Sequence, residues 1–291
     1  MKTRLLPHLL RLCLICLPVL FPGTVSAKPT LVWAVLDFPP FQILSGPHAG
    51  SGSFDGELQA LMAAMPEYEH RVETMSFSRR KAEFLAGTPM CTPGIFLPPA
   101  QALKLAISRP ALTHLDNRVV YLPDKAHRFG SAPSLDVETL FHRPDLVGGL
   151  AQSRSFAPVV DGALSRHQGQ HHLVVRALSG EVLFRMLLAG ELDYLIMFPH
   201  EAAFLAETLG AGMVLHTRPI RGVPPYQYTH VACTGNDWGR GMIARIDAVL
   251  DQEMDKPAYR ALSERWYPKP DQARVRRYFA GMVRERAGPA R

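Results

Sequence analysis

Short apolar runs alternate with helical patterns along the first third of the chain. Residues 31–36 form an apolar run that stops at Pro39, which predicts a buried strand that ends where proline cannot extend the ladder. An apolar pattern with helical spacing begins at Asp55 and stops at Pro66. Further strands are predicted over residues 71–75 and 90–91, and a helix over residues 79–85. This alternation predicts a mostly parallel sheet covered by helices.

The alternation restarts after a break rich in proline and glycine over residues 123–133. Strands and helices then alternate again over residues 146–216, which completes a second α/β unit. A second break, over residues 219–225, precedes a strand over residues 228–233. Two more helices follow over residues 238–252 and 258–266, and the basic tail after Pro270 is expected to lie at the periphery.

Two α/β units separated by two such crossings predict an α/β protein of two lobes, joined by a two-stranded hinge with a cleft between them. The first lobe would comprise residues 28–122 and 226–291, and the second lobe residues 123–225. Residues 1–27 would precede the first lobe as a leader.

The leader has the pattern of a secretory signal. Cations at Lys2, Arg4 and Arg11 precede an apolar run over residues 12–21, and small residues end at Ala27. The alternative is a membrane anchor, but the run is about half of the roughly 20 residues that a spanning helix needs. We therefore predict cleavage after Ala27 and export to the periplasm.

Composition excludes several classes of protein. Of the 291 residues, 47% are hydrophobic and 20% are charged, which is usual for a globular protein and excludes a disordered chain. The formal net charge of +6 is spread without a dense basic run, so nucleic-acid binding is not expected. No phosphate loop, dinucleotide fingerprint or hydrolase elbow occurs, so we predict no cofactor and no catalysis.

Two histidine patterns suggest a metal site but are incomplete. His200-Glu201 begins like the helix of a zinc protease, yet Phe204 stands at the second ligand position. A second group lies in a polar stretch that contains no nearby carboxylate or cysteine. Its members are His167, His171 and His172. We therefore predict no metal site.

Removal of the leader leaves two cysteines, Cys91 and Cys233. Two thiols in an oxidising compartment can form a disulfide, and a buried pair of reduced cysteines is the alternative. The residues alone leave both readings open.

Six short motifs follow one another along residues 38–267. They lie at residues 38–41 (Phe-Pro-Pro-Phe), 52–57 (Gly-Ser-Phe-Asp-Gly-Glu), 107–110 (Ile-Ser-Arg-Pro), 147–155 (Val-Gly-Gly with Gln152 to Ser155), 189–194 (Ala-Gly-Glu-Leu-Asp-Tyr) and 246–267 (the closing helices). In this order they resemble the bacterial extracellular solute-binding proteins of family 3, which include the polar amino-acid binders and have the class II periplasmic-binding-protein fold. The resemblance implies that fold for this chain.

Two positions depart from the amino-acid binders of that family. An arginine that clamps the ligand carboxylate corresponds to Gln101, and an acidic residue that receives the ligand amine corresponds to Phe198. These charge-assisted bonds select an α-amino acid. We therefore expect a different, less polar ligand.

The resemblance also implies a ligand site between the lobes. Phe38 and Phe41 from one lobe and Phe198 from the other would form an aromatic sandwich, or Phe41 would be core and only Phe38 would touch the ligand. Arg154 and Ser155 precede a helix, where free N–H groups favour an anion; the alternative is a solvated arginine and an N-cap serine. Thr92 and Ser108 complete the expected set.

These implications define the expected function. The chain would be a monomeric solute-binding protein that presents a small solute to an ABC permease or to the periplasmic domain of a sensor. The alternative is an exported accessory or signalling protein that kept the fold and binds a protein partner. The returning strand would lie beside the third strand, which would bring Cys91 and Cys233 close enough to pair.

Overall fold

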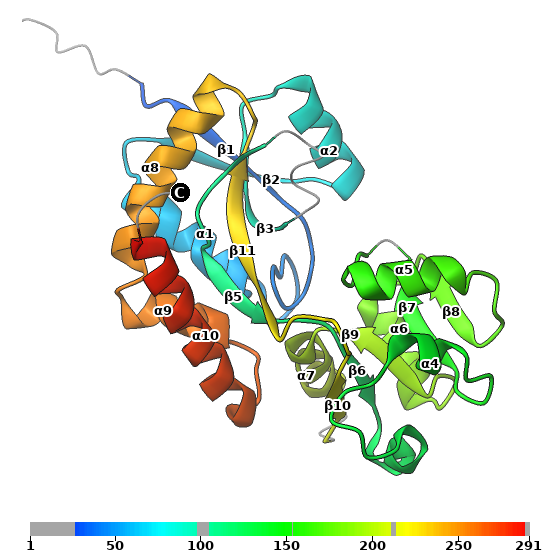
Figure 1. Ribbon diagram of the computed structural model, residues 1–291. Coiled ribbons are helices and arrows are strands. Elements are labelled where there is room, and N and C mark those ends of the chain that lie inside the picture. The colour runs from blue at the N-terminus through cyan, green and yellow to red at the C-terminus, as the bar shows by residue number, and fades with distance from the viewer. Residues whose placement is uncertain (1–26, 98–104, 153, 211–213, 289–291) are drawn as a thin grey trace, which may run out of the picture.

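The chain folds into two lobes, each built on one sheet that is flanked by helices (Figure 1). The computed structural model describes residues 27–97, 105–152, 154–210 and 214–288. The predicted α/β class with two lobes is confirmed. The leader lies almost wholly outside the described residues.

The sheet of lobe I has six strands in the order β2-β1-β3-β11-β4, with β5 paired to β11. The strands are β1 (Thr30–Val35), β2 (Glu69–Thr74), β3 (Cys91–Phe96), β4 (Ala106–Ile107), β5 (Leu112–Leu115) and β11 (Tyr226–Cys233). β1 runs parallel to β2 and β3, whereas β11 returns antiparallel to β3. The register of that return sets Cys233 opposite Cys91, and the two residues form a disulfide, the pairing that the resemblance implied.

Within the described ranges, the helices of lobe I are α1 (Ser53–Ala64), α2 (Phe77–Ala86), α8 (Asp237–Glu253), α9 (Pro257–Glu264) and α10 (Lys269–Ala287). In Figure 1, α8, α9 and α10 lie together on one side of the lobe and α2 lies on the other. The Asp55 carboxylate accepts bonds from the N–H groups of Gly52 and Ile43, which holds the start of α1 against the preceding loop. α2 begins at the N-cap Ser76 and ends at Gly87, whose φ of 82° needs glycine.

The tail after Pro270 differs from the expectation of a peripheral segment, because it forms the 19-residue helix α10. Val275, Phe279 and Met282 fall on one face of this helix and are buried against lobe I. Near its end, the Arg286 side chain is 2% exposed and pairs with Asp247 of α8. The many cations of the tail conceal this apolar stripe in the sequence.

Lobe II has a five-stranded sheet in the order β10-β6-β9-β7-β8. Its strands are β6 (Arg118–Tyr121), β7 (Gly148–Ala151), β8 (Leu173–Arg176), β9 (Tyr194–Met197) and β10 (His216–Pro219). Its helices are η1 (Pro123–Phe129), α4 (Val137–Phe141), α5 (Pro158–Arg166), α6 (Gly180–Leu188) and α7 (Pro199–Thr208). β7 is parallel to β8 and β9, and β6 is antiparallel to β9 and β10.

The first crossing between the lobes lies earlier than the boundary expected after residue 122. β5 pairs with β11 in lobe I, whereas β6 pairs with β9 and β10 in lobe II, so the chain crosses at Asp116 and Asn117. No glycine or proline marks this step, and the nearest breaker residues on either side are Pro110 and, in η1, Pro123. The returning crossing lies between β10 and β11, close to the expected boundary after residue 225.

None of the helices within the described ranges is long and apolar enough to cross a membrane.

Candidate functional site

Aromatic side chains from both lobes meet in one cluster. The ring centroid of Phe41 lies 4.8 Å from that of Phe38 and 5.1 Å from that of Phe198, and Phe96 stacks on Phe198 at 5.6 Å. Phe41 is completely buried and also packs on Phe54, so it is core and it contacts the opposite lobe. Of the three rings expected to enclose a ligand, Phe41 contacts the other two directly and meets Phe198 edge to face, at an interplanar angle of 77°.

A tight turn after β1 presents these rings. The N–H of Phe41 bonds to the carbonyl of Phe38, and Phe38 forms an isolated bridge with Gln42. The carbonyl of Phe41 accepts the N–H of Phe54 at the start of α1. The two prolines between Phe38 and Phe41, joined by a cis peptide bond, can donate no hydrogen bond, so the strand ends here and the chain turns back.

The Arg154 guanidinium lies between aromatic faces of the two lobes. Its central carbon is 5.3 Å from the ring centroid of Phe38 in lobe I and 5.2 Å from that of Phe198 in lobe II. Nη1 donates to both carboxylate oxygens of Glu201, each at 2.8 Å. The two side chains are 14% and 4% exposed. Charge-assisted bonding and two cation–π contacts thus hold a cation between the lobes.

Nη2 of Arg154 is buried and has no hydrogen-bond partner among the described residues. A buried donor without a partner costs about 1–3 kcal/mol. The Arg154 guanidinium is therefore hydrogen-bonded at Nη1, whereas its Nη2 is a buried donor without a partner among the described residues.

The carboxylate of this pair was missed by the sequence analysis. Phe198 occupies the expected acidic position, but Glu201 lies one helical turn further, in the first turn of α7. An anion in that turn is favoured by the positive end of the helix dipole. The signal available in the sequence was an acidic residue directly after a buried strand, and it was considered only as part of a zinc motif.

Two buried histidines face each other across the lobes. The rings of His114 on β5 and His200 on α7 stack at 5.5 Å, and no ring nitrogen of either has a hydrogen-bond partner among the described residues. Burial lowers the pKa of His114 to about 3. Burial, together with repulsion from His114 in its protonated form and from Arg154, lowers the pKa of His200 well below its usual value. Both rings are neutral at pH 7, and Tyr267 packs on His200 at 4.6 Å.

Thr92 and Ser108, both expected in the ligand site, make local contacts instead. Thr92 is buried and accepts a bond of 3.0 Å from Arg80 Nη1. The Ser108 hydroxyl donates to the carbonyl of Arg109 and accepts the N–H of Val231, which ties the segment after β4 to β11 within lobe I. Neither residue joins the aromatic cluster, because the Thr92 hydroxyl bonds to Arg80 and the Ser108 hydroxyl bonds to neighbouring backbone groups. Gln101 lies outside the described residues.

The expected anion site before α5 is occupied by the chain itself. Asp161 accepts the N–H of Phe156 and the hydroxyl of Ser155, which is exposed. The helix begins with Pro158, which has no N–H to offer. Arg154 therefore joins the cluster, whereas Ser155 does not.

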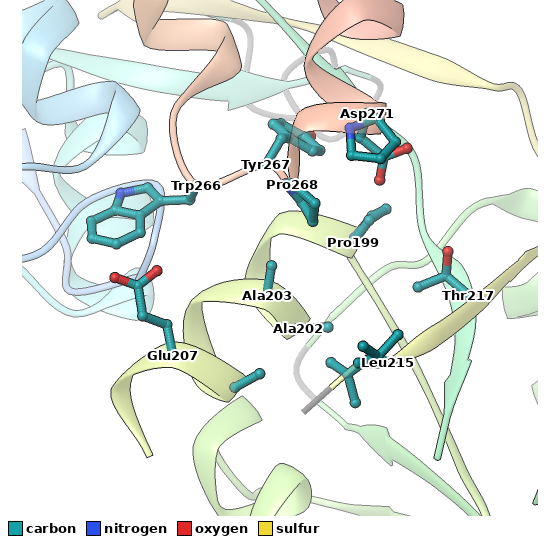
Figure 2. A pocket seen from close by; sticks show the side chains of 13 residues that line it. Pro199, Ala202, Ala203, Glu207, Leu215, Thr217, Trp266, Tyr267, Pro268 and Asp271 are labelled. Carbon is teal, nitrogen blue, oxygen red and sulfur yellow. The ribbon is translucent and has the colours of Figure 1, made fainter. Parts of the chain in front are cut away.

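A pocket of about 760 Å³ lies outside the cluster, where α7 and β10 face the segment that joins α9 to α10 (Figure 2). Figure 2 shows Trp266 and Pro268 on one side of it and Ala203 and Leu215 on the other. The expected ligand residues do not line this pocket. Its lining residues are Pro199, Ala202, Ala203, Ala206, Glu207, Val214, Leu215, Thr217, Trp266, Tyr267, Pro268, Pro270 and Asp271.

No protein-family model matches the chain, and no curated protein matches it either. Solved structures do match. A histidine kinase sensor domain with similarity to periplasmic binding proteins shares 17% identity at a TM-score of 0.61, over 82% of this chain and 96% of the sensor domain. The arginine-, lysine-, histidine-binding protein ArtJ of Geobacillus stearothermophilus shares 16% identity at 0.58, over 85% of this chain and 99% of ArtJ.

A third structure concerns glutathione import via GshT and the cystine ABC importer TcyBC of Streptococcus mutans. It shares 12% identity at a TM-score of 0.63, over 85% of this chain and all of the other. At these identities the similarity shows the fold. The chain has a two-lobed periplasmic-binding-protein-like fold, and the resemblance drawn from the six motifs is confirmed at that level.

Proposed function

We propose that this chain is an exported solute-binding protein whose inter-lobe site accepts a small solute with a planar, cationic head group. The observation that carries the proposal is the Arg154 guanidinium, which is held between Phe38 and Phe198 against the buried carboxylate of Glu201. A solute that displaced Arg154 would meet the same two aromatic faces and the same carboxylate. Arg154 thus acts as a tethered occupant of the site.

A solute can shift the lobes only if it binds one arrangement better than the other. Phe38 belongs to lobe I and Glu201 to lobe II, so a cation between them favours closure. Because Arg154 already makes these contacts, a free solute must compete with a tethered group whose effective concentration is on the order of millimolar. We therefore expect weak binding by the natural chain and tighter binding once Arg154 is shortened.

Several observations support the proposal beyond the site itself. The arginine-, lysine-, histidine-binding protein with this fold binds solutes of the same charge class. The disulfide between Cys91 and Cys233 suits an oxidising compartment such as the periplasm. The partner that reads the closed form would be an ABC permease or the periplasmic domain of a sensor. We propose that the chain acts as a monomer, by binding and without catalysis.

Thermal unfolding with matched solutes tests this function. Agmatine and L-arginine carry a guanidinium, whereas L-citrulline replaces it with a neutral group of nearly the same shape. At a hundredfold excess over its dissociation constant, a ligand adds about 2.7 kcal/mol, which raises Tm by several degrees. We expect such a rise for agmatine or arginine in Arg154→Ala, a smaller rise in the natural chain, and none for citrulline.

Glu201→Gln provides the matched control, because it removes the negative charge and preserves the shape of the side chain. The cationic solutes should then stabilise neither the single variant nor the double variant with Arg154→Ala. Equal stabilisation by citrulline and arginine, or no response of Arg154→Ala to any cation, would contradict the proposal.

A second candidate is the accessory or signalling protein that binds a protein partner. It is favoured by the direct contact between the lobes, where Phe41 meets Phe198 and His114 meets His200. If these contacts keep the lobes closed permanently, small solutes shift nothing. Small-angle scattering that shows one closed form for the natural chain and for Arg154→Ala, with or without solutes, would favour this candidate.

A further inference from the structure

Away from the inter-lobe site, lobe II brings one carboxylate and two imidazoles together. Ligand atoms of Glu138, His142 and His167 all lie within 4.8 Å of one another. Glu138 belongs to α4, His142 caps the end of α4 and His167 caps the end of α5. The sequence analysis set the histidine stretch aside for lack of a nearby carboxylate, but packing of α4 on α5 supplies one.

His142 has one ring nitrogen available for a metal ion. Its Nδ1 lies 2.8 Å from the main-chain carbonyl of Glu138. Because a carbonyl only accepts hydrogen bonds, Nδ1 carries the proton and Nε2 keeps a lone pair. The ring stands at 90° to that of His167, with centroids 4.3 Å apart.

His167 is held in a state that a metal ion would change. Its Nε2 lies 2.9 Å from Glu138 Oε2, and its Nδ1 lies 2.8 Å from the amide nitrogen of Gln170. An amide nitrogen only donates, so in this arrangement Nδ1 accepts and Nε2 carries the proton toward Glu138.

Gln170 Oε1 is buried and has no hydrogen-bond partner among the described residues. Turning the Gln170 amide by half a rotation would set Oε1 against Nδ1 of His167. The ring proton would then sit on Nδ1 and donate to Oε1, and the Nε2 lone pair would become available. An accepting oxygen against Nδ1 is the usual outer-shell arrangement of a ligating histidine.

We propose that Glu138, His142 and His167 bind a zinc ion or a similar divalent transition-metal ion, with water as a further ligand. Two imidazoles and one carboxylate form a usual donor set for zinc. Glu138 would bind through Oε2, while its Oε1 keeps the ion pair with Arg166, whose Nε lies 2.8 Å away. The site is independent of the solute proposed above.

Calorimetric titration of the metal-free protein with Zn²⁺, prepared without a polyhistidine tag, tests this site. We expect one ion per chain and a visible spectrum typical of four-coordinate cobalt when Co²⁺ replaces Zn²⁺. His142→Ala should weaken binding at least a hundredfold and abolish that spectrum. Its side chain is exposed, so the fold should persist, which circular dichroism checks. Gln170→Ala, which removes only the outer partner, should weaken binding about 10- to 100-fold.

His127→Ala is the matched control. This exposed histidine also has Nδ1 on a main-chain carbonyl, that of Asp124 at 2.9 Å, but it belongs to no such cluster among the described residues. Its substitution should leave binding unchanged. The proposal is overturned if Zn²⁺ does not bind in a one-to-one ratio, or if His142→Ala and His127→Ala bind it equally well.

Discussion

Two arginines with little exposed side chain, 2% for Arg286 and 14% for Arg154, differ in how completely their guanidinium groups are hydrogen-bonded. Arg286, inside lobe I, donates from Nε to Asp251, from Nη1 to the carbonyl of Pro110, and from Nη2 to Asp247. Arg154, between the lobes, bonds only through Nη1, and its Nη2 has no partner among the described residues. Displacing Arg286 would break more hydrogen bonds than displacing Arg154.

The difference separates what holds a lobe together from what holds the lobes to each other. Lobe I buries charge inside a network that is complete on its own. The inter-lobe cluster relies on aromatic contacts, neutral histidines and one ion pair, which are interactions that water or a solute can replace when the lobes part. The following substitutions and pH changes test this separation.

Arg286→Ala should have the largest effect on stability. It removes every bond listed above for that guanidinium and leaves the carboxylates of Asp247 and Asp251 without it. Removing one partner of a fully buried pair costs about 3–5 kcal/mol. Because Arg109 still pairs with both carboxylates and Asp251 is 45% exposed, we expect about 2–3 kcal/mol here. Urea unfolding followed by circular dichroism measures the loss. A loss below about 1 kcal/mol would show that the network does not hold lobe I together.

Acid should open the cluster before it affects lobe I. Histidine titrates near 6.5 in an unfolded chain, and the pKa of buried His114 is about 3. Between these two pKa values the unfolded or open form binds more protons than the closed form. The contribution of His114 to the stability of the closed form is therefore full above pH 6.5 and falls as the pH drops below it. The loss is about 1.4 kcal/mol per pH unit for one histidine. His200 adds to it in the same direction.

The lobe I network should withstand the same acid range. Burial opposes ionisation of Asp251, but hydrogen bonds from Arg109 and Arg286 outweigh it and lower the pKa of that carboxyl. Its contribution is therefore lost only below the usual aspartate range. Between pH 7 and 4.5, small-angle scattering should show an expansion of the molecule, while circular dichroism shows no loss of helix. The substitution His114→Leu should reduce this expansion. Expansion that is unchanged in His114→Leu would rule out this origin.

Arg154→Ala should loosen closure at a smaller cost. Glu201 loses its buried partner, but opening of the lobes lets water reach it, so we expect about 1–2 kcal/mol rather than the loss at Arg286. A double-mutant cycle with Glu201→Gln isolates the coupling between the two side chains. A coupling energy near zero would mean that the ion pair does not contribute to closure.

Phe38→Ala should have the smallest effect. It removes the cation–π face that Phe38 offers to Arg154 across the lobes and the stacking of Phe38 on Phe41 within lobe I, together worth about 1 kcal/mol. Phe77→Ala is the control, because that ring on α2 is 62% exposed and should change stability by less than about 0.5 kcal/mol. Equal effects of the two substitutions would argue against a role for Phe38 in closure.

The order of strands, helices and breaks could be predicted because each depends on local patterns. The apolar run of β1, the proline turn after it and the return strand that carries Cys233 all have signals within a few residues. The first crossing was expected some five residues too late, because no breaker residue marks Asp116 and Asn117. Helix α10 was not predicted, because its apolar stripe lies among many cations.

The sequence by itself determined the fold class and the two lobes, since hydrophobic periodicity and turn residues act locally, and the resemblance to family 3 indicated which aromatic residues lie between the lobes. Only the tertiary structure decided which charges meet. Glu201 finds Arg154 across 47 residues, and Glu138 finds His167 across 29, because folding brings distant segments together. No local sequence pattern indicates such a contact. The hydrogen-bond partners that a charged side chain has in the folded protein determine whether it stabilises the fold or can be displaced by a ligand.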